Sequence, residues 1–564
     1  MSTIDWSILI FSLVFIVSYG VYKGRGNTNI KGYLMADNNI RWYVVALSVM
    51  ATQASAITFL STPGQAFADG MGFIQFYLGL PIAMIVISAT IIPLYHKLKV
   101  FTAYEFLEKR FNIQTRGLAA MLFLIQRGFA AGFTIYAPAI ILSTLLGWNI
   151  YLTNTLIGVL VIIYTASGGS KAVSYTQTQQ MIIIMLAMGG AFYMILHLLP
   201  QDVSFTDALF VAGKMGKLDA IDFSFDLTKK YSIWSGVIAG FFLQLSYFGT
   251  DQSQVQRYVT GKNVAHSRMG LLTNGMVKVP MQFFILLLGV MVFVFYQFSA
   301  PPLFFNSVTG QQVRDGKYGN EYRMIETQYE TASNQKNELI QKLVQARHSG
   351  DQTAIDAVAS QLETTEKKVT GLKAKGVELI HKTTKNTDEK DTNYIFLYFI
   401  LQYMPVGLLG LIIAAIVAAS MSSTSSELNS LASTTVVDFY KRFYKKEASD
   451  RHYLVASKLI TVAWGFIAIG FAQFANRLGT LIEAVNILGS LFYGTILGIF
   501  LVAFYVKFVK GSAAFYAAML AEVGVLCCFF FTDISFLWYN VVGCFLVIIF
   551  SIPIHHMQKK QLTA

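Results

Sequence analysis

Charged residues and cysteines are scarce in this chain of 564 residues. Only 13% of the residues are charged, whereas a soluble protein usually has about a quarter. The three cysteines, Cys527, Cys528 and Cys544, fall in the last two apolar segments, so no disulfide framework is expected. The sequence also lacks an HExxH motif, a phosphate-binding glycine loop and a Cys/His metal cluster. These absences argue against a soluble protein, a disulfide-rich secreted domain and a metalloenzyme.

The chain is instead rich in long apolar runs. Hydrophobic residues make up 54% of it, and the mean hydropathy is +0.52. Runs of roughly 20 apolar residues can cross a bilayer as helices. The first run begins close to Met1 without a basic stretch or a cleavage site, so we expect a retained helix and not a signal peptide. The expected fold is an all-α polytopic membrane protein with about thirteen transmembrane helices, near residues 5–22, 40–62, 70–96, 118–146, 150–167, 176–199, 232–250, 268–298, 406–436, 453–474, 480–507, 512–531 and 536–555.

The formal net charge of +12 is concentrated in alternate loops. By the positive-inside rule these loops are cytoplasmic, which indicates a multi-pass protein of the plasma or inner membrane and no nucleic-acid partner. An N-terminus outside and a C-terminus inside follow, and this combination agrees with an odd number of spans. The basic loop segments are YKGRG, HKLKV, EKRFNIQTRG, QRYVTGKN, YKRFYKKEASDR, VKFVKG and HHMQKK.

Two outer segments, 200–231 and 300–393, are too polar to span a membrane. The longer one has helical periodicity interrupted at HSGD, which predicts two amphipathic helices folded back on each other with Gly350 in the turn. Such a hairpin is either a solvated addition to the outer face or a partner-binding domain. The apolar stretch 394–404 is too short to span and is expected at the outer interface.

A cluster of oxygen-bearing side chains interrupts one apolar run. Residues 420–430 read SMSSTSSELNS and directly follow the lipid-like VGLLGLIIAAIVAA. Polar residues inside a span are costly and usually mark a pathway. Every histidine except His197 lies in a loop, so a serine–histidine nucleophile is not indicated. Hydroxyls without a strong base suit a monovalent cation better than covalent catalysis.

A second polar interruption lies in the segment ALSVMATQASAITFLSTPG (46–64), at ATQASAIT. A helix unwound there exposes backbone carbonyls, which is tolerated only where they line a cavity or bind an ion. The alternative is that these small residues only allow close helix packing.

The segment GFFLQLSYFGTDQ (240–252) carries a similar interruption five helices later. Because five is odd, two consecutive five-helix repeats have opposite membrane orientations, and paired interrupted helices in such repeats indicate a transporter site. The expected boundaries are 1–39 for the first helix and inner loop, 40–199 for repeat one, 200–231 for an outer loop, 232–299 for the start of repeat two, 300–393 for the insertion, 394–507 for the rest of repeat two, and 508–564 for two C-terminal helices and a short cytoplasmic tail.

Five stretches carry a family resemblance: GTDQSQVQRYVTGKN (249–263), FTAYEFLEKRFN (101–112), IYAPAIIL (135–142), SGGSKAV (167–173) and SSELNSLAS (425–433). The chain resembles the sodium/solute symporter family, which includes sodium/glucose, sodium/iodide and sodium/multivitamin cotransporters. The first and third stretches are most similar to the iodide, multivitamin and monocarboxylate branch. The resemblance covers nearly the whole chain outside the insertion, and it implies a leucine-transporter-type five-plus-five inverted repeat.

The resemblance also implies site residues, by matching position. The sodium site would use backbone oxygens and hydroxyls of Ala51, Ala54, Ala419, Ser422 and Ser423. The substrate cavity between the interrupted helices would be lined by Thr58, Gln75, Tyr77, Gln244 and Lys278, with Phe76 as the outer and Tyr247 as the inner aromatic gate.

Several residues depart from the family pattern. Ile57 and Thr58 stand where sugar transporters carry an acid and an amide, and Tyr77 replaces an acid, which argues against a sugar-type cavity. Lys278 is either a ligand for a carboxylate or a structural lysine that bonds helix ends. Gln177 stands where many relatives carry the aspartate of a second sodium site, so the resemblance implies one sodium and not two.

Arg127 lies about ten residues into the fourth span, where a charge is costly unless paired. At 1.5 Å per residue it lies about 15 Å from the inner end of its helix, and Glu427 lies roughly 13 Å from the same face. We therefore expect a buried pair between Arg127 and Glu427, near the second-ion position of two-sodium relatives. The alternative is that the long arginine side chain reaches the cytoplasmic headgroups.

The combined interpretation is a sodium-coupled secondary active symporter, not an enzyme. It would import a small polar organic solute, such as a sugar, a carboxylate or a vitamin-like compound, by alternating access. Its partners would be Na⁺, the solute and the lipid bilayer. The alternatives are a transporter-like receptor that signals through the outer hairpin, and a membrane-embedded enzyme.

Overall fold

The structure is a computed structural model, and it describes the chain except for residues 25–28, 384–390, 476–479 and 564. Apart from an isolated bridge between Ile40 and Gly261, the regular structure of the described residues is helical. The elements are α1 (Thr3–Gly24), α2 (Ile30–Met35), η1 (Ala36–Asn38), α3 (Trp42–Gln53), α4 (Ala56–Asp69), η2 (Gly70–Tyr77), α5 (Leu80–Leu98), α6 (Glu105–Arg110), α7 (Ile113–Leu146), α8 (Ile150–His197), α9 (Phe205–Lys214), η3 (Ser235–Ala239), α10 (Gly240–Gly249), α11 (Gln252–Val259), α12 (Val264–Phe298), α13 (Ser307–Arg314), α14 (Gly319–Ser349), α15 (Gln352–Thr383), α16 (Thr392–Tyr403), α17 (Leu408–Thr434), η4 (Thr435–Tyr444), α18 (Asp450–Ala472), α19 (Leu481–Tyr505), α20 (Gly511–Phe531) and α21 (Phe536–Thr563).

Ten helices of the described residues are long and apolar enough to cross a membrane. Three shorter apolar helices cover Trp42–Gln53, Ile150–Ile163 and Ser235–Gly249. The expected count of thirteen is therefore not confirmed. The difference arises because breaks shorten some spans, and Gly169, with φ +64°, also bends α8 in its middle.

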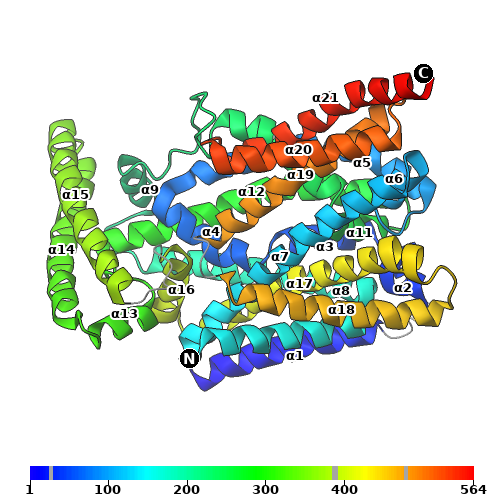
Figure 1. The fold of residues 1–564 in the computed structure, drawn as a ribbon. Helices are drawn as coiled ribbons and strands as arrows, with labels where there is room; N and C mark the ends of the chain where they lie inside the picture. Colours follow the sequence, from blue (N-terminus) through cyan, green and yellow to red (C-terminus); the bar gives the residue numbers. More distant parts are fainter. Residues whose placement is uncertain (25–28, 384–390, 476–479, 564) are drawn as a thin grey trace.

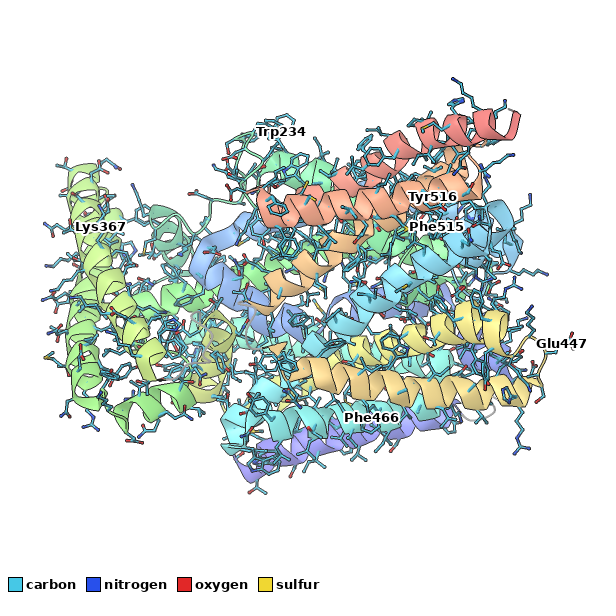
Figure 2. The ribbon with its side chains drawn as sticks, in the orientation of Figure 1. Trp234, Lys367, Glu447, Phe466, Phe515 and Tyr516 are labelled. Carbon is cyan, nitrogen blue, oxygen red and sulfur yellow. The ribbon has the colours of Figure 1, made fainter. Side chains whose placement is uncertain are left out.

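The long helices lie side by side, and the hairpin of α14 and α15 stands across one end of the bundle (Figure 1). Charged Lys367 and Glu447 mark the two opposite ends of the molecule in Figure 2, whereas Phe466 lies along the flank. Phe466 of α18 is 60% exposed. Large exposed apolar side chains on the flanks of a helix bundle are what contact with lipid requires, so the chain is a multi-pass membrane protein.

Two helices are interrupted where the sequence predicts it. The first gap separates α3 from α4 at Ala54 and Ser55, whose ψ angles of 76° and 174° are not helical. The second separates α10 from α11 at Thr250 and Asp251, and Asp251 has a ψ of 120°. The Asp251 carboxylate accepts a hydrogen bond from the Ser253 amide at 2.8 Å and so caps α11.

The first turn of α17 is bonded to α1. Oδ1 of Asp5 in α1 accepts hydrogen bonds from the backbone amides of Gly407 at 2.7 Å and Gly410 at 3.0 Å. These amides belong to the first turn of α17, where no intrahelical acceptor is available. Gly407 has φ +90°, and a Cβ on Gly410 would lie only 2.5 Å from the Asp5 carbonyl oxygen. The two helices therefore meet with their backbones in contact.

The insertion forms the expected helical hairpin. Gly350, with φ +70°, ends α14 and turns the chain into α15. The turn docks on α9, because Arg347 and His348 contact the Asp207 carboxylate at 3.0 and 3.1 Å. Near the other end of the hairpin, Lys373 contacts Asp391 at 3.3 Å.

The short apolar stretch after the insertion forms α16, and it is buried among other helices. Phe396, Phe399 and Ile400 are fully buried, and α16 packs against α4 and α12. Its Asn393 accepts a hydrogen bond from the Ser61 hydroxyl of α4 at 2.9 Å. This helix therefore packs on α4, the second half of the first interrupted helix.

Candidate functional site

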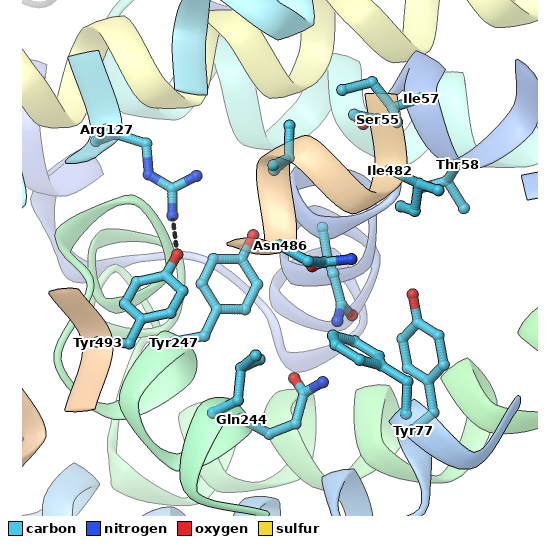
Figure 3. A pocket seen from close by; sticks show the side chains of 14 residues that line it. Ser55, Ile57, Thr58, Tyr77, Arg127, Gln244, Tyr247, Ile482, Asn486 and Tyr493 are labelled. Carbon is cyan, nitrogen blue, oxygen red and sulfur yellow. Dashed lines mark hydrogen bonds between the residues drawn. The ribbon is translucent and has the colours of Figure 1, made fainter. Parts of the chain in front are cut away.

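The two interrupted helices face a common cavity of about 80 Å³. Residues after the first break and before the second break contribute to its wall, and α7 and α19 complete it (Figure 3). The cavity is lined by Gln53, Ser55, Ile57, Thr58, Phe76, Tyr77, Arg127, Leu243, Gln244, Tyr247, Ile482, Val485, Asn486 and Tyr493.

Three of the five expected substrate residues, Thr58, Tyr77 and Gln244, line this cavity, together with both expected gates, Phe76 and Tyr247. The rings of Phe76 and Tyr77 meet edge to face at 4.9 Å. Both amide atoms of Gln244 lack hydrogen-bond partners among the described residues. A buried amide without partners costs free energy unless water or a ligand meets it, so Gln244 is placed to receive a polar ligand.

Gln75 lies outside the cavity. Its amide nitrogen donates to the carbonyls of Gly72 and Tyr231, each at 3.2 Å, and its amide oxygen accepts from the backbone of Asp222 at 2.9 Å. The tight turns of η2 point the Gln75 side chain away from the cavity, whereas the Tyr77 side chain faces the cavity. In this structure Gln75 fixes the outer loop against η2.

Lys278 lies behind Tyr77 and does not line the cavity. Its Nζ atom is 5.6 Å from the centre of the Tyr77 ring and is fully buried. Within the part of the chain that the structure describes, this nitrogen has no hydrogen-bond partner. The amide groups of Asn274 and Gln282, one turn to either side on α12, are equally buried and unpartnered. Tyr77, which does line the cavity, is therefore the neighbour through which this polar stripe reaches nearest to it at Lys278.

Four of the expected sodium ligands lie in two contacting pairs. The Ser422 hydroxyl donates to the Ala51 carbonyl at 3.4 Å, and the Ser423 hydroxyl donates to the Ala419 carbonyl at 3.1 Å. Ala51 is in the last turn of α3, where carbonyls lack intrahelical donors. Ala54 follows in the break itself, and all five residues are buried. The donor set is neutral oxygen, which suits a hard monovalent cation such as sodium.

Gln177 of α8 lies next to these residues. Its amide nitrogen donates to Thr52 Oγ1 at 3.1 Å, the Ser422 carbonyl at 3.2 Å and Ser426 Oγ at 2.8 Å. Its amide oxygen accepts from the Ser48 hydroxyl. One neutral side chain therefore joins α3 to α17, and its nitrogen is surrounded by three oxygens.

Arg127 and Glu427 contact each other, and a second acid joins them. Nη1 of Arg127 donates to Glu427 Oε1 at 3.0 Å, and Nη2 donates to an oxygen of Asp251 and to the Tyr493 hydroxyl at 2.6 Å. The guanidinium carbon lies 5.4 Å from the centre of the Tyr247 ring. The long side chain therefore remains in the interior and does not extend to the headgroups.

Sequence reasoning missed Asp251 and the whole wall contributed by α19. Asn486 and Tyr493 are polar residues inside an apolar span. Because polar groups are costly in a membrane, their positions could have predicted a place in the cavity wall. Ile482 and Val485 carried no such signal. Asp251 lies in the quoted GTDQ stretch, but its contact with Arg127 joins residues 124 positions apart. Only the packing of the repeats reveals that contact.

Comparisons with known proteins agree with this geometry. The model of the Sodium:solute symporter family matches residues 33–317 and 369–521. A sodium-dependent multivitamin transporter of Oryctolagus cuniculus is 25% identical over 509 residues, which are 88% of this chain and 66% of that protein. The sodium/sialic acid symporter NanT of Aliivibrio fischeri is 25% identical over 566 residues, covering 100% of this chain and 95% of that protein.

A solved structure of a Na⁺-coupled sialic acid symporter, in a substrate-bound outward-open state, has the same fold. The TM-score is 0.76 at 23% sequence identity, with 99% of this chain and 98% of that chain covered. The family match includes both interrupted helices and leaves out residues 318–368, which lie in α14 and α15. Helix α14 and the first half of α15 therefore lie outside the family match.

Proposed function

The chain belongs to the sodium:solute symporter family, and from this premise we propose that it is a secondary active symporter that imports a small polar organic solute together with sodium by alternating access. One observation carries the proposal: the two interrupted helices face the same cavity, and each contributes residues to it. Paired broken helices around a central site are the architecture on which alternating access operates. The relatives named above are transporters and not enzymes.

Sodium is the coupling ion, and we assign its site to the break in α3–α4 and the hydroxyls of α17. The carbonyls of Ala51, Ala54 and Ala419 with the hydroxyls of Ser422 and Ser423 supply five neutral oxygens. A cation bound there holds α3 against α17. A membrane potential near 100 mV contributes about 2.3 kcal/mol per sodium ion. This is roughly forty-fold accumulation of solute per charge, since each 1.4 kcal/mol is a factor of ten.

The solute site is the cavity itself. Thr58, Tyr77 and Gln244 offer a hydroxyl, a phenol and an unpartnered amide, and Phe76 and Tyr247 cover two of its sides. This mixture suits a compact solute with several polar groups, whether a sugar, a carboxylate or a vitamin-like compound. We favour a carboxylate, because the unpartnered amine of Lys278 lies directly behind Tyr77 and an anion nearby would compensate its charge.

We also propose the arrangement in the membrane. The basic loops place the N-terminus outside and the C-terminus in the cytoplasm of a plasma or inner membrane. The two inverted five-helix units then cover 40–199 and 232–507, with the outer hairpin inserted into the second. The receptor alternative receives no support from the named relatives, and the hairpin retains only a peripheral role in this scheme.

Uptake into proteoliposomes tests the proposal. A screen of sugars, carboxylates and vitamins by thermal shift, with and without sodium, first identifies compounds that stabilise the purified protein. Radiolabelled uptake of each hit is then measured with an inward sodium gradient and with a potassium gradient of equal size. Accumulation that requires sodium and collapses with a sodium ionophore supports symport. Sodium-independent equilibration, or stabilisation by a solute that is never taken up, contradicts it.

A further inference from the structure

Three charged side chains meet beside the cavity, and their charges do not cancel. Arg127, Asp251 and Glu427 have exposed fractions of 4%, 2% and 4%. One guanidinium contacts both carboxyl groups, so the cluster carries a net charge of −1 if both acids are ionised. An uncompensated charge in a buried site is strongly destabilising. A cation or a proton must therefore accompany the cluster.

The hydrogen bonds of Thr134 show where a proton fits. Its hydroxyl oxygen lies 2.9 Å from each of three oxygens: the Ala131 carbonyl, the Thr424 hydroxyl and Glu427 Oε2. A hydroxyl donates one hydrogen and accepts two. If Thr134 donates to the carbonyl and accepts from Thr424, the contact with Glu427 contains a hydrogen only when Oε2 carries it. With Glu427 ionised, one of the three contacts lacks a hydrogen.

Asp251 accepts more hydrogen bonds than Glu427 does. Its Oδ1 accepts from the Ser253 amide at 2.8 Å and the Ser253 hydroxyl at 2.6 Å. Its Oδ2 accepts from Arg127 and from the Tyr493 hydroxyl at 3.1 Å. The carboxylate also caps the N-terminus of α11, where negative charge is stabilised. Four donors and a helix terminus therefore meet the Asp251 carboxylate, whereas Glu427 is met by Arg127 and Thr134.

We propose that Glu427 is a proton-binding site whose proton resides on Oε2 while Asp251 holds the Arg127 guanidinium. This deepens the symport function proposed above and rests on it where transport is concerned. In the arrangement described, the cluster is an arginine–aspartate ion pair with a neutral glutamic acid beside it, and it carries no net charge. Glu427 Oε1 remains the acceptor for Arg127 Nη1 in both protonation states.

The position of each group links the proton to conformation. Arg127 and Glu427 project from the unbroken helices α7 and α17, whereas Asp251 lies in the break between α10 and α11. A movement of the broken helix that withdraws Asp251 leaves Glu427 as the remaining anionic partner of the guanidinium. The O–H bond of the acid then breaks, its electron pair stays on the carboxylate, and the proton passes to water in the cavity. The reverse movement returns it.

Several other charged or ionisable groups lie on the elements around α17. Tyr247 and Tyr493 face the cluster from α10 and α19, and Arg257 is the next charged residue along α11. The side chains that α3 and α8 present next to Glu427, at Thr52 and Gln177, are neutral. Among the other charged groups on packed helices, Asp5 is bonded to the first turn of α17, Arg116 is paired with Asp438, and Lys458 lies over the Tyr33 ring. Lys23, Asp69, Lys171, Lys441, Arg442, Asp450 and Arg451 are the further charged residues of these elements.

Infrared spectroscopy of the purified full-length protein reads the protonation state without transport. The difference spectrum between wild type and Glu427→Gln should contain the carbonyl band of an un-ionised carboxylic acid at neutral pH. Carboxylate bands in that difference spectrum would overturn the proposal. The matched control is Glu108→Gln on α6: burial raises the pKa of Glu108, but hydrogen bonds from Arg116 and Arg442 outweigh this and hold it below its ordinary value. Its difference spectrum should contain only carboxylate bands.

A second variant tests the competition for the guanidinium. Asp251→Asn keeps a side chain that caps α11 and removes the charge that engages Arg127. In this background the difference spectrum produced by Glu427→Gln should change from acid to carboxylate bands. A persistent acid band would show that Asp251 does not control the proton, and would overturn the conformational link.

Uptake measurements are the third test of the proposal. In proteoliposomes, sodium-driven uptake by wild type should change with internal and external pH, and the same pH dependence should be lost in Glu427→Gln. An unaltered pH dependence in a variant that still transports would overturn the role of Glu427. Absence of sodium-driven uptake in wild type would instead contradict the proposed function, while the infrared result would still decide the protonation of Glu427.

Discussion

Replacing Arg127 by alanine should damage the protein far more than neutralising Glu427. The guanidinium is the cation that meets Asp251, so Arg127→Ala leaves a buried carboxylate without a partner. Breaking a buried ion pair from one side costs about 3–5 kcal/mol. Glu427→Gln keeps the arginine–aspartate pair and an amide in place of the acid, and it should cost only about 0.5–1.5 kcal/mol, the value of one ordinary hydrogen bond.

The difference between the two variants is about 2–4 kcal/mol, a large part of a total stability of about 5–15 kcal/mol. Thermal unfolding of detergent-solubilised protein ranks the variants by stability. The readout is the height of the monodisperse peak in size-exclusion chromatography after heating. We expect wild type and Glu427→Gln to lie close together and Arg127→Ala to lie far below them. The double variant Arg127→Ala/Asp251→Asn should regain most of the loss, because it removes the orphaned charge together with its partner.

A matched control uses the other buried arginine of α7. Arg116 pairs with Asp438 at 2.6 Å near the inner end of the bundle. Arg116→Ala should also be destabilising, but adding Asp251→Asn should not restore it. Equal losses for Arg127→Ala and Glu427→Gln would refute the assignment of Asp251 as the ionised partner. A double variant no better than Arg127→Ala would refute it independently.

Three further outcomes are expected. Ser423→Ala should raise the sodium concentration needed for half-maximal uptake while surface expression stays intact, and an unchanged sodium response would contradict the sodium site assigned here. Gln177→Asp should create a second sodium site and so make sodium activation sigmoidal, because a carboxylate replaces the amide whose nitrogen is surrounded by Thr52, Ser426 and the Ser422 carbonyl. A hyperbolic response in a variant that still transports would contradict this second site. Deleting residues 320–385 with a short linker should preserve uptake, since the hairpin lies outside the helices that form the cavity, and loss of uptake by a correctly inserted deletion variant would assign the hairpin a transport role.

The sequence predicts the interrupted helices well because their signal is local. Small and polar residues within an otherwise apolar run mark the break at 54–55, and the second break at 250–251 has the same signature. The contact between Arg127 and Glu427 follows from helix rise alone, because both helices cross the membrane and depth is then fixed by residue count. Quantities that depend only on distance along one helix are therefore accessible from sequence.

Features that depend on side-chain direction or on packing between repeats were not accessible. Gln75 and Tyr77 are two residues apart, yet the 3₁₀ geometry of η2 sends one to the outer loop and the other to the cavity. Lys278 has the right depth, but Tyr77 stands between it and the cavity. The third member of the charge cluster, Asp251, is brought to Arg127 by the docking of the second repeat on the first.

The bond between Asp5 and the first turn of α17 has a consequence for biogenesis. Helix α1 carries an acceptor for backbone amides that lie 402 and 405 residues later in the chain. Until α17 has been inserted, Oδ1 of that carboxylate lacks these two amide donors, and α1 can pack only against partners that are already in the bilayer, such as α8. Contacts of such long sequence separation form late. The helix that bears Ser422 and Ser423 is therefore fixed at its first turn only near the close of membrane insertion, and substitution of Asp5 should delay maturation of the protein more than it changes the finished cavity.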